Sequence, residues 1–428
     1  MNFTIHYLLP LFYFVLLAFL LKRNKYLLNG GISAPAIILF FTAKCAAGII
    51  ANYISLHFFK NGGDISLYFS DGLRLYQALM HSPSAFFGML KEMFTIDDFA
   101  LLNGHSDFIH TVFEGFKFLQ FIGNLFSFGN IYTNTILFNA LTSLLFLRCW
   151  VFFKNYTAGW IAGTLLFLMP SAFFYTSSIL KEGVAYALIA ALIPLAYKWS
   201  RSFQIRYAAL FLLLFVFLFF FKFLIAISFA CALITWLMLA KFPRFKALIL
   251  FSVFASCIAV FFLSKYIHPS LDLPRYLVNR QQEFLALEAG SAMQVQVPEP
   301  NFTGFLKVLP SATANVLFRP LPGEGSNLYY LAHSLEIYLF WGIVLFMAVK
   351  NRFRIRPSLV PNLAWAFLLF AVCNLLIIGY IVPNIGAMVR YRSIFLPWLA
   401  LFFWYLLNGN SWLYDYRLLL NNAKPNKP

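Results

Sequence analysis

Apolar runs long enough to cross a bilayer recur from one end of the chain to the other. A membrane span needs about 20 mainly apolar residues, and a helix satisfies its own backbone hydrogen bonds in lipid. Eleven runs fit this pattern, roughly residues 4–21, 33–57, 130–149, 157–175, 182–198, 207–221, 223–240, 246–264, 331–349, 361–380 and 393–408. The pattern predicts an all-α fold, a polytopic transmembrane helical bundle in a single integral membrane domain over residues 1–428.

The stretch 207–240 is apolar and is interrupted by a single charge, Lys222. It is too long for one span and short for two, so we expect a tight helical hairpin that turns at Lys222. Residues 1–21 lack the basic start and the small-residue cleavage site of a signal peptide, and they are therefore predicted as a span.

Two long segments, 58–129 and 265–330, separate the apolar runs. Within the first, Ser84–Phe94 and Phe108–Phe128 repeat apolar residues every three to four positions without reaching spanning length. This pattern is typical of amphipathic helices that lie in the membrane interface. Long ordered segments of this kind are usually functional.

The composition excludes a soluble protein: 61% of the residues are hydrophobic and only 11% are charged. Soluble domains carry about 25% charged residues. The loops at 22–32, 148–157, 198–206, 241–246 and 350–356 and the tail after 409 hold 18 Lys and Arg against one acid, Asp415. The positive-inside rule places these segments in the cytoplasm, with the N-terminus outside and the C-terminus inside. The net charge of +17 is therefore loop charge, and no nucleic-acid partner is implied.

The first long outer segment carries candidate chemistry at its start. On a helix, Asp64, Tyr68 and Asp71 would share one face at the membrane surface. Two glycines at 62–63 form a turn that can seat Asp64 near a helix N-terminus. The structural alternatives are a helix N-cap for Asp64 and a cap or turn for Asp71, which precedes a glycine.

A second candidate lies in the turn from Pro170 to Gly183, which contains the adjacent pair Lys181 and Glu182. Charges at membrane depth are costly and usually line a water-filled cavity. The alternative is an N-terminal helix cap by Ser178 with Glu182 in the first turn. Lys44 lies inside an apolar run and must face a cavity or a partner, which the sequence does not name.

Arginines mark the remaining candidates, since Arg can hold a phosphate with two hydrogen bonds. Arg280 and Arg319 lie in the second long segment, where Glu283 and Glu324 offer surface ion pairs as the alternative.

Arg390, Tyr391 and Arg392 lie between two spans on the expected outer side, after a stretch at 379–386 that is broken by glycine and proline. With Lys222, these arginines could bind a polyprenyl phosphate or pyrophosphate in a re-entrant turn. The alternative is that they snorkel to lipid headgroups.

These motifs resemble those of the GT-C superfamily of membrane glycosyltransferases. The shared features are Asp-x-x-x-Tyr at Asp64 and Tyr68, Pro-x7-Ser-x2-Lys-Glu from Pro170 to Glu182, and Arg-Tyr-Arg-x4-Pro from Arg390 to Pro397. A closer likeness covers most of the chain. It is to a group of polytopic bacterial envelope proteins with a Lys-Glu-Gly turn, an Asn-x-x-x-Arg-Pro stretch and a Gly-x-x-x-Arg-Tyr-Arg ending.

The resemblance implies a bacterial inner-membrane enzyme that takes a polyprenyl-phosphate sugar donor. Asp64 would be the catalytic acid of the first outer loop, acting as a base or as a metal ligand, and Glu182 a second acid. Transfer also needs cations on the leaving phosphate. These would come from Lys222, Arg390, Arg392 and Arg319.

The acceptor, a glycan, lipid or protein, and a divalent metal stay open, and no nucleotide-binding motif is present. The alternatives are an O-antigen-type polymerase or ligase, which relies on outer arginines, and a lipid or glycan transporter or flippase.

Overall fold

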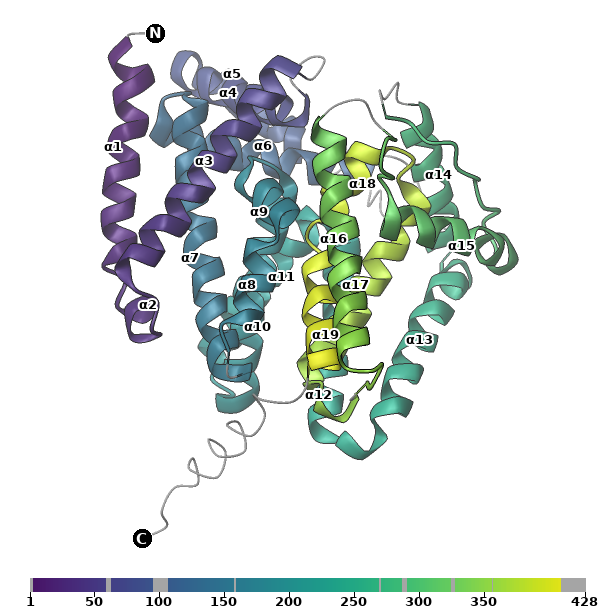
Figure 1. Cartoon of the computed structure of the whole chain (residues 1–428). Coiled ribbons are helices and arrows are strands. Elements are labelled where there is room, and N and C mark those ends of the chain that lie inside the picture. The colour runs from purple at the N-terminus through teal and green to yellow at the C-terminus, as the bar shows by residue number, and fades with distance from the viewer. Residues whose placement is uncertain are drawn as a thin grey trace. The chain divides into compact units, whose positions relative to one another are not determined.

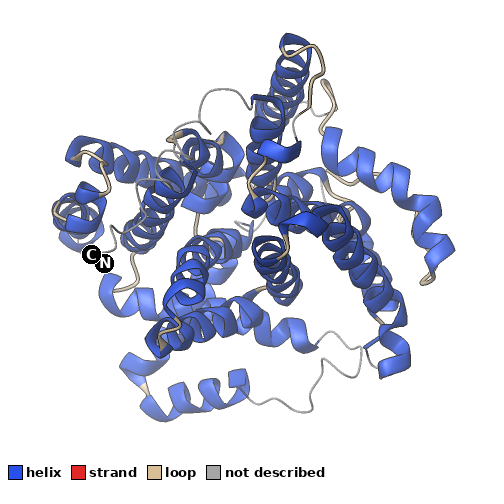
Figure 2. Ribbon diagram, turned by 90° about the horizontal axis from the view of Figure 1, so that it is seen from below, coloured by secondary structure: helices blue, strands red, loops and turns tan. Residues whose placement is uncertain are grey.

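The structure is a computed structural model that describes residues 3–58, 63–94, 107–157, 159–268, 271–286, 291–324, 328–355 and 357–408. Its regular elements in these ranges are all helices (Figures 1 and 2). The described ranges also contain one isolated β-bridge, between Ala292 and Asn384. The all-α prediction is therefore confirmed. The chain divides into two compact units, and their union in a single membrane domain stays a prediction.

Unit 1 comprises Met1–Phe152 and Phe173–Ala226. Its helices are α1 (Phe3–Lys22), α2 (Lys25–Asn29), α3 (Ala34–Phe58), α4 (Gly63–His81), α5 (Pro83–Phe94), α6 (Asp107–Ser127), most of α7 (Ile131–Thr157), most of α9 (Pro170–Ser177), α10 (Lys181–Ser202) and α11 (Ile205–Phe221).

Unit 2 comprises Phe153–Ala172 and Ile227–Pro428. Its helices are α8 (Ile161–Leu168), most of α12 (Phe223–Lys241), η2 (Pro243–Phe245), α13 (Lys246–Ile267), α14 (Leu273–Ala286), α15 (Phe302–Phe318), α16 (Leu328–Lys350), η4 (Pro357–Leu359), α17 (Asn362–Ile381), α18 (Ile385–Arg392) and α19 (Leu396–Asn408).

Seven helices of the described chain are long and apolar enough to cross a membrane, which indicates a multi-pass integral membrane protein. They are α3, α7, α10, α12, α13, α16 and α17. The pair α18 and α19, bent by 54°, would make an eighth span. The expected count of eleven is not reached by this measure, because the apolar parts of α1 and α11 are shorter and the run 157–175 is broken.

The break in that run falls at Met169, whose extended backbone separates α8 from α9. Each of the two helices has eight residues, so neither reaches spanning length. Pro170 begins the second helix, where its missing N–H costs nothing. The break expected at Lys222 is confirmed, since this residue alone separates α11 from α12, and the hairpin expected there stays a prediction.

The two expected amphipathic helices are present as α5 and α6. Leu75, Phe86 and Phe121 bring α4, α5 and α6 together around one apolar cluster. Gly72 permits the close approach of α4 to α6, because a Cβ at this position would come within 2.5 Å of the Gln120 Cβ.

Buried polar side chains follow one helix of unit 1. Six of them lie on α7, namely Thr133, Asn134, Thr135, Asn139, Thr142 and Ser143, and a seventh, Asn130, directly precedes it. The Asn134 amide donates to Asn124 of α6 at 2.8 Å, and the Thr135 hydroxyl accepts from Asn52 of α3 at 2.7 Å. Hydrogen bonds therefore join α7 to its neighbours, as is common between helices in lipid.

Candidate functional site

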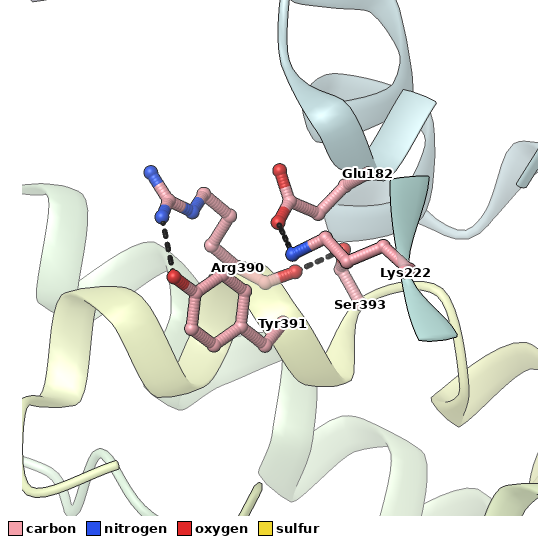
Figure 3. A network of polar contacts seen from close by, with 5 residues as sticks. All are labelled: Glu182, Lys222, Arg390, Tyr391 and Ser393. Carbon is pink, nitrogen blue, oxygen red and sulfur yellow. Dashed lines mark hydrogen bonds and ion pairs between the residues drawn. The ribbon is translucent and has the colours of Figure 1, made fainter. Parts of the chain in front are cut away.

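Glu182 and Lys222, two of the sequence candidates, form an ion pair in unit 1. The Lys222 Nζ lies 3.4 Å from the Glu182 Oε1, although 40 residues separate the two in the sequence. Figure 3 shows the two side chains pointing toward one another. The Glu182 side chain is only 4% exposed and that of Lys222 is 26% exposed. The structure thus supplies a buried carboxylate with a cation at the break between α11 and α12.

The start of α10 brings this carboxylate into place. Leu180 is the N-cap residue of α10, and Glu182 lies in the first turn, where the helix dipole favours an acid. The alternative in which Ser178 caps this helix is wrong, because its hydroxyl donates to the Phe174 carbonyl at 3.0 Å. The Ser178 side chain therefore hydrogen-bonds back to α9, and α10 begins without a side-chain cap.

Lys181, the neighbour of Glu182, reaches α4. Its ammonium lies 5.1 Å from the centre of the Tyr68 ring, within cation–π distance. Tyr68 is buried and meets Phe116 of α6 edge to face, and Phe116 in turn contacts Phe221 beside Lys222. Aromatic packing therefore connects the two lysines of the site.

Asp64 lies in the first turn of α4, four residues before Tyr68 and hence on the same face. Gly63 has a φ of +59°, which glycine adopts readily, and it opens this helix as expected. Asp64 is the second residue of the helix and is half-buried. The sequence prediction that places Asp64 at a helix N-terminus beside Tyr68 is confirmed.

Asp71 has a different setting from the one expected. It lies in the middle of α4, so the expectation of a cap or turn is wrong. Its carboxylate pairs with Lys117 of α6 at 3.2 Å and with Arg74 at 3.6 Å. The contact with Lys117 joins α4 to α6, and Gly72, the next residue, permits the two helices to approach closely.

Lys44 now has identified partners. Its side chain is fully buried, and its ammonium donates to the Thr176 carbonyl at 3.1 Å, to the Thr176 hydroxyl at 3.3 Å and to the Ser177 hydroxyl at 3.1 Å. The rings of Phe146 and Phe173 flank the charge at 4.8 and 5.5 Å. Lys44 thus binds the last turn of α9, directly before the turn that carries Lys181 and Glu182.

The arginines expected to bind phosphate lie in unit 2. Arg392 is buried and donates to the main-chain carbonyls of Val316 and Arg319 at the end of α15. Arg319 pairs with Glu324 at 3.0 Å, and Arg280 pairs with Glu283. The ion pairs offered as alternatives for Arg280 and Arg319 are therefore both present.

Arg390 is half-buried, and its guanidinium donates to the Tyr391 hydroxyl at 2.9 Å (Figure 3). The Tyr391 ring meets Phe284 of α14 edge to face, on the helix that carries Arg280. On that helix, burial raises the pKa of Tyr276, and the charge of Arg280 opposes the shift. The structure thus brings α14 and α18 together beside Arg390.

A hydrogen-bonded cap fixes the start of α18. The Asn384 side chain accepts from the Gly386 and Ala387 N–H groups and from the Ser291 hydroxyl. The short helix after the proline- and glycine-rich stretch was expected as a re-entrant turn. In the structure, α18 is followed by a 54° bend into α19, a geometry that a broken span and a re-entrant loop share, so the re-entrant turn stays a prediction.

Sequence reasoning missed one charged group of unit 2. Glu336 of α16 accepts from the Ser171 N–H at 2.9 Å, and its other oxygen lies 3.6 Å from the His333 Nδ1. Both side chains are about nine-tenths buried. The sequence contains the signal for this group, because Glu336 is an acidic residue inside the predicted span 331–349.

No group of three or more His, Cys, Asp or Glu that could hold a metal ion occurs in the described ranges. Comparison with protein-family models, with curated proteins and with solved structures finds no match to this chain.

Proposed function

We propose that the protein is a membrane glycosyltransferase that takes its sugar from a polyprenyl-phosphate donor. The observation that carries the proposal is the meeting in unit 1 of three segments far apart in the sequence. Asp64 and Tyr68 come from α4, Lys181 and Glu182 from α10, and Lys222 from the end of α11. Ionisable groups buried among membrane helices usually serve function, since their burial is costly.

The chemistry of sugar transfer requires two kinds of group. A carboxylate must take the proton of the acceptor hydroxyl as its oxygen bonds to the anomeric carbon. Cations must stabilise the phosphate that leaves as the bond from the anomeric carbon to the phosphate oxygen breaks. In this proposal Asp64 is the base, because it is half-buried and therefore more accessible to an acceptor than Glu182, whose side chain is 4% exposed. Lys181 and Lys222 supply the positive charge.

The sidedness of the site follows from charge. The basic loops favour the cytoplasm, which puts α4 and the start of α10 on the opposite, periplasmic face of a bacterial inner membrane. A donor delivered there is lipid-linked, and the acceptor is a glycan, a lipid or a protein.

The proposal is tested with purified wild-type protein and the Asp64→Asn variant in detergent. We expect wild type to release polyprenyl phosphate from lipid-linked sugar donors and Asp64→Asn to lose at least 100-fold of this activity while still binding the lipid. Asp272→Asn is the matched control: the same change at the start of α14, where Asn caps as well as Asp. Full activity of Asp64→Asn would exclude the assigned base.

The same assay separates the polymerase or ligase alternative. That enzyme class would tolerate Asp64→Asn and lose activity with Arg319→Ala and Arg390→Ala. A transporter is favoured by one observation, the helix break at Met169 with Glu336 bound to the start of α9. Solute flux into proteoliposomes without turnover of the donor would identify it.

A further inference from the structure

Three basic segments of unit 1 converge on one aromatic ring. The guanidinium of Arg148, late in α7, lies 5.1 Å from the centre of the Tyr26 ring, and the ammonium of Lys198, late in α10, lies 5.8 Å from it. Tyr26 itself belongs to α2, the short helix between α1 and α3. The charge pattern predicts that the segments 22–32, 148–157 and 198–206 lie on the same side of the membrane. In the structure, residues of these three segments contact one another.

A second tyrosine extends the arrangement. Lys198 also lies 5.9 Å from the ring of Tyr207, and Arg206 lies 4.8 Å from that ring and donates to its hydroxyl at 3.2 Å. We call these five residues, Tyr26, Arg148, Lys198, Arg206 and Tyr207, the Tyr26 cluster. Its three cations are exposed, and Tyr26 is 39% exposed.

The cluster has no acidic counterpart in the part of the chain that the structure describes. The segments 22–32, 148–157 and 198–206 contain no Asp or Glu, and none of the three cations forms an ion pair there. Like charges gathered around shared rings repel one another unless an anion lies between them. The arrangement is therefore complementary to an anionic ligand.

The position of the cluster points to the class of ligand. Arg148 and Lys198 lie toward the C-terminal ends of two helices long enough to span a membrane, and Tyr26 lies shortly before a third. Such positions lie near the lipid headgroups. Exposed apolar side chains adjoin the cluster in the sequence, with Phe203 81% and Ile205 83% exposed, as suits contact with acyl chains.

The donors suit a phosphate. Arg holds phosphate oxygens through two N–H groups, Lys adds a point charge, and a phenol donates one hydrogen bond. Burial raises the pKa of Tyr26, with the charge of Arg148 opposing, so its hydroxyl keeps its proton at neutral pH.

We propose that the Tyr26 cluster binds the phosphate headgroup of an anionic phospholipid. The site is separate from the residues assigned to sugar transfer, and it does not rest on the proposed function. If basic loops attracted anionic lipid only in a general way, the strength of binding would depend on the number of charges alone. At a specific site, the strength of binding depends on which charged residues are removed.

The test uses the full chain in detergent with added phosphatidylglycerol or phosphatidylcholine, and native mass spectrometry counts the bound lipids. We expect wild type to retain phosphatidylglycerol selectively and the double variant Arg148→Gln, Lys198→Gln to bind it about 30-fold more weakly, since each basic residue near an anionic surface contributes about fivefold. The control Arg352→Gln, Arg354→Gln removes two exposed charges from a loop of unit 2 and should retain wild-type binding. Equal weakening by both double variants overturns the site, as does equal retention of the two lipids by wild type.

Two further arms identify the ligand and guard against misfolding. Glycerol 3-phosphate carries the headgroup chemistry without acyl chains. If it protects the protein against heat as well as phosphatidylglycerol does at the same concentration, the ligand is a soluble phosphate and the lipid assignment fails. Tyr26→Leu removes the ring that Arg148 and Lys198 share and keeps all three cations, and it should weaken phosphatidylglycerol binding without lowering the melting temperature in phosphatidylcholine. Unchanged binding in this variant overturns the role of the ring.

Discussion

The ammonium of Lys44 donates a hydrogen bond to the main-chain carbonyl of Thr176 across 132 residues of sequence. This carbonyl belongs to the last turn of α9, where carbonyl groups lack partners within the helix. A positive charge there is also favoured by the helix dipole. Lys44 thus fixes the end of a helix of only eight residues, three residues before the turn delivers Lys181 and Glu182.

We expect Lys44→Met to destabilise the protein by about 3 kcal/mol, because it leaves a carbonyl and two hydroxyl groups buried without their donor. The melting temperature in detergent measures the effect. Lys307→Met, at an exposed position of α15, is the matched control and should leave the melting temperature unchanged. Equal melting of the two variants would contradict the role of Lys44.

The Glu182–Lys222 pair predicts strong coupling in a double-mutant cycle. Lys222→Gln leaves the 4%-exposed carboxylate of Glu182 without this cation and should cost about 3 kcal/mol. The double variant Glu182→Gln, Lys222→Gln should recover part of that loss, since no charge is left buried. Additive effects of the two single changes on the free energy of unfolding would show that the two side chains do not interact.

Gly379 tests the packing of α17 on α15. A Cβ at this position would lie 2.4 Å from the Ala312 carbonyl oxygen, so Gly379→Ala should destabilise by about 1–3 kcal/mol. Gly342 of α16 has open space around it, and Gly342→Ala should be neutral or stabilise by up to about 1 kcal/mol. Thermal unfolding of the two variants in the same detergent checks the difference.

Arg390 and Arg392 should behave differently although only one residue separates them. Arg392→Lys should lower the melting temperature, because one ammonium cannot reproduce the bonds of a buried guanidinium to the Val316 and Arg319 carbonyls. Arg390→Lys should melt close to wild type, since its bond goes to the half-buried Tyr391. A larger loss of stability in Arg390→Lys than in Arg392→Lys would contradict these assignments.

Hydropathy predicts the long spans well because a continuous apolar run admits few other folds in lipid. The ranges expected at 33–57 and 361–380 agree with α3 and α17 to within a residue or two at each end. The run 157–175 was interpreted as one span, since the hydropathy of its side chains hides the backbone break at Met169. The hydropathy of an apolar run is the same whether its proline begins a new helix or lies inside a continuous one.

The candidate site was predictable only in part, for a physical reason. Lys181 and Glu182 could be identified from the sequence, because they are charged residues at an expected membrane depth where burial is costly. The placement of Asp64 on one helix face with Tyr68 followed from helix periodicity. Partners such as Lys222 for Glu182 depend on packing between distant helices, which no local pattern encodes. Arg392 shows the converse error, since a guanidinium suited to phosphate here serves two backbone carbonyls.

The polar side of α7 has a consequence for biogenesis. A helix with six buried polar side chains is costly to expose to acyl chains. Its Asn134 amide donates to α6 and its Thr135 hydroxyl accepts from α3, and both of these helices are synthesised before it. During membrane insertion α7 therefore gains from leaving the translocon alongside these earlier helices rather than alone. The Asn139 amide donates to the Ser177 carbonyl at 2.8 Å, so the later helix α9 closes this side only after translation has passed it.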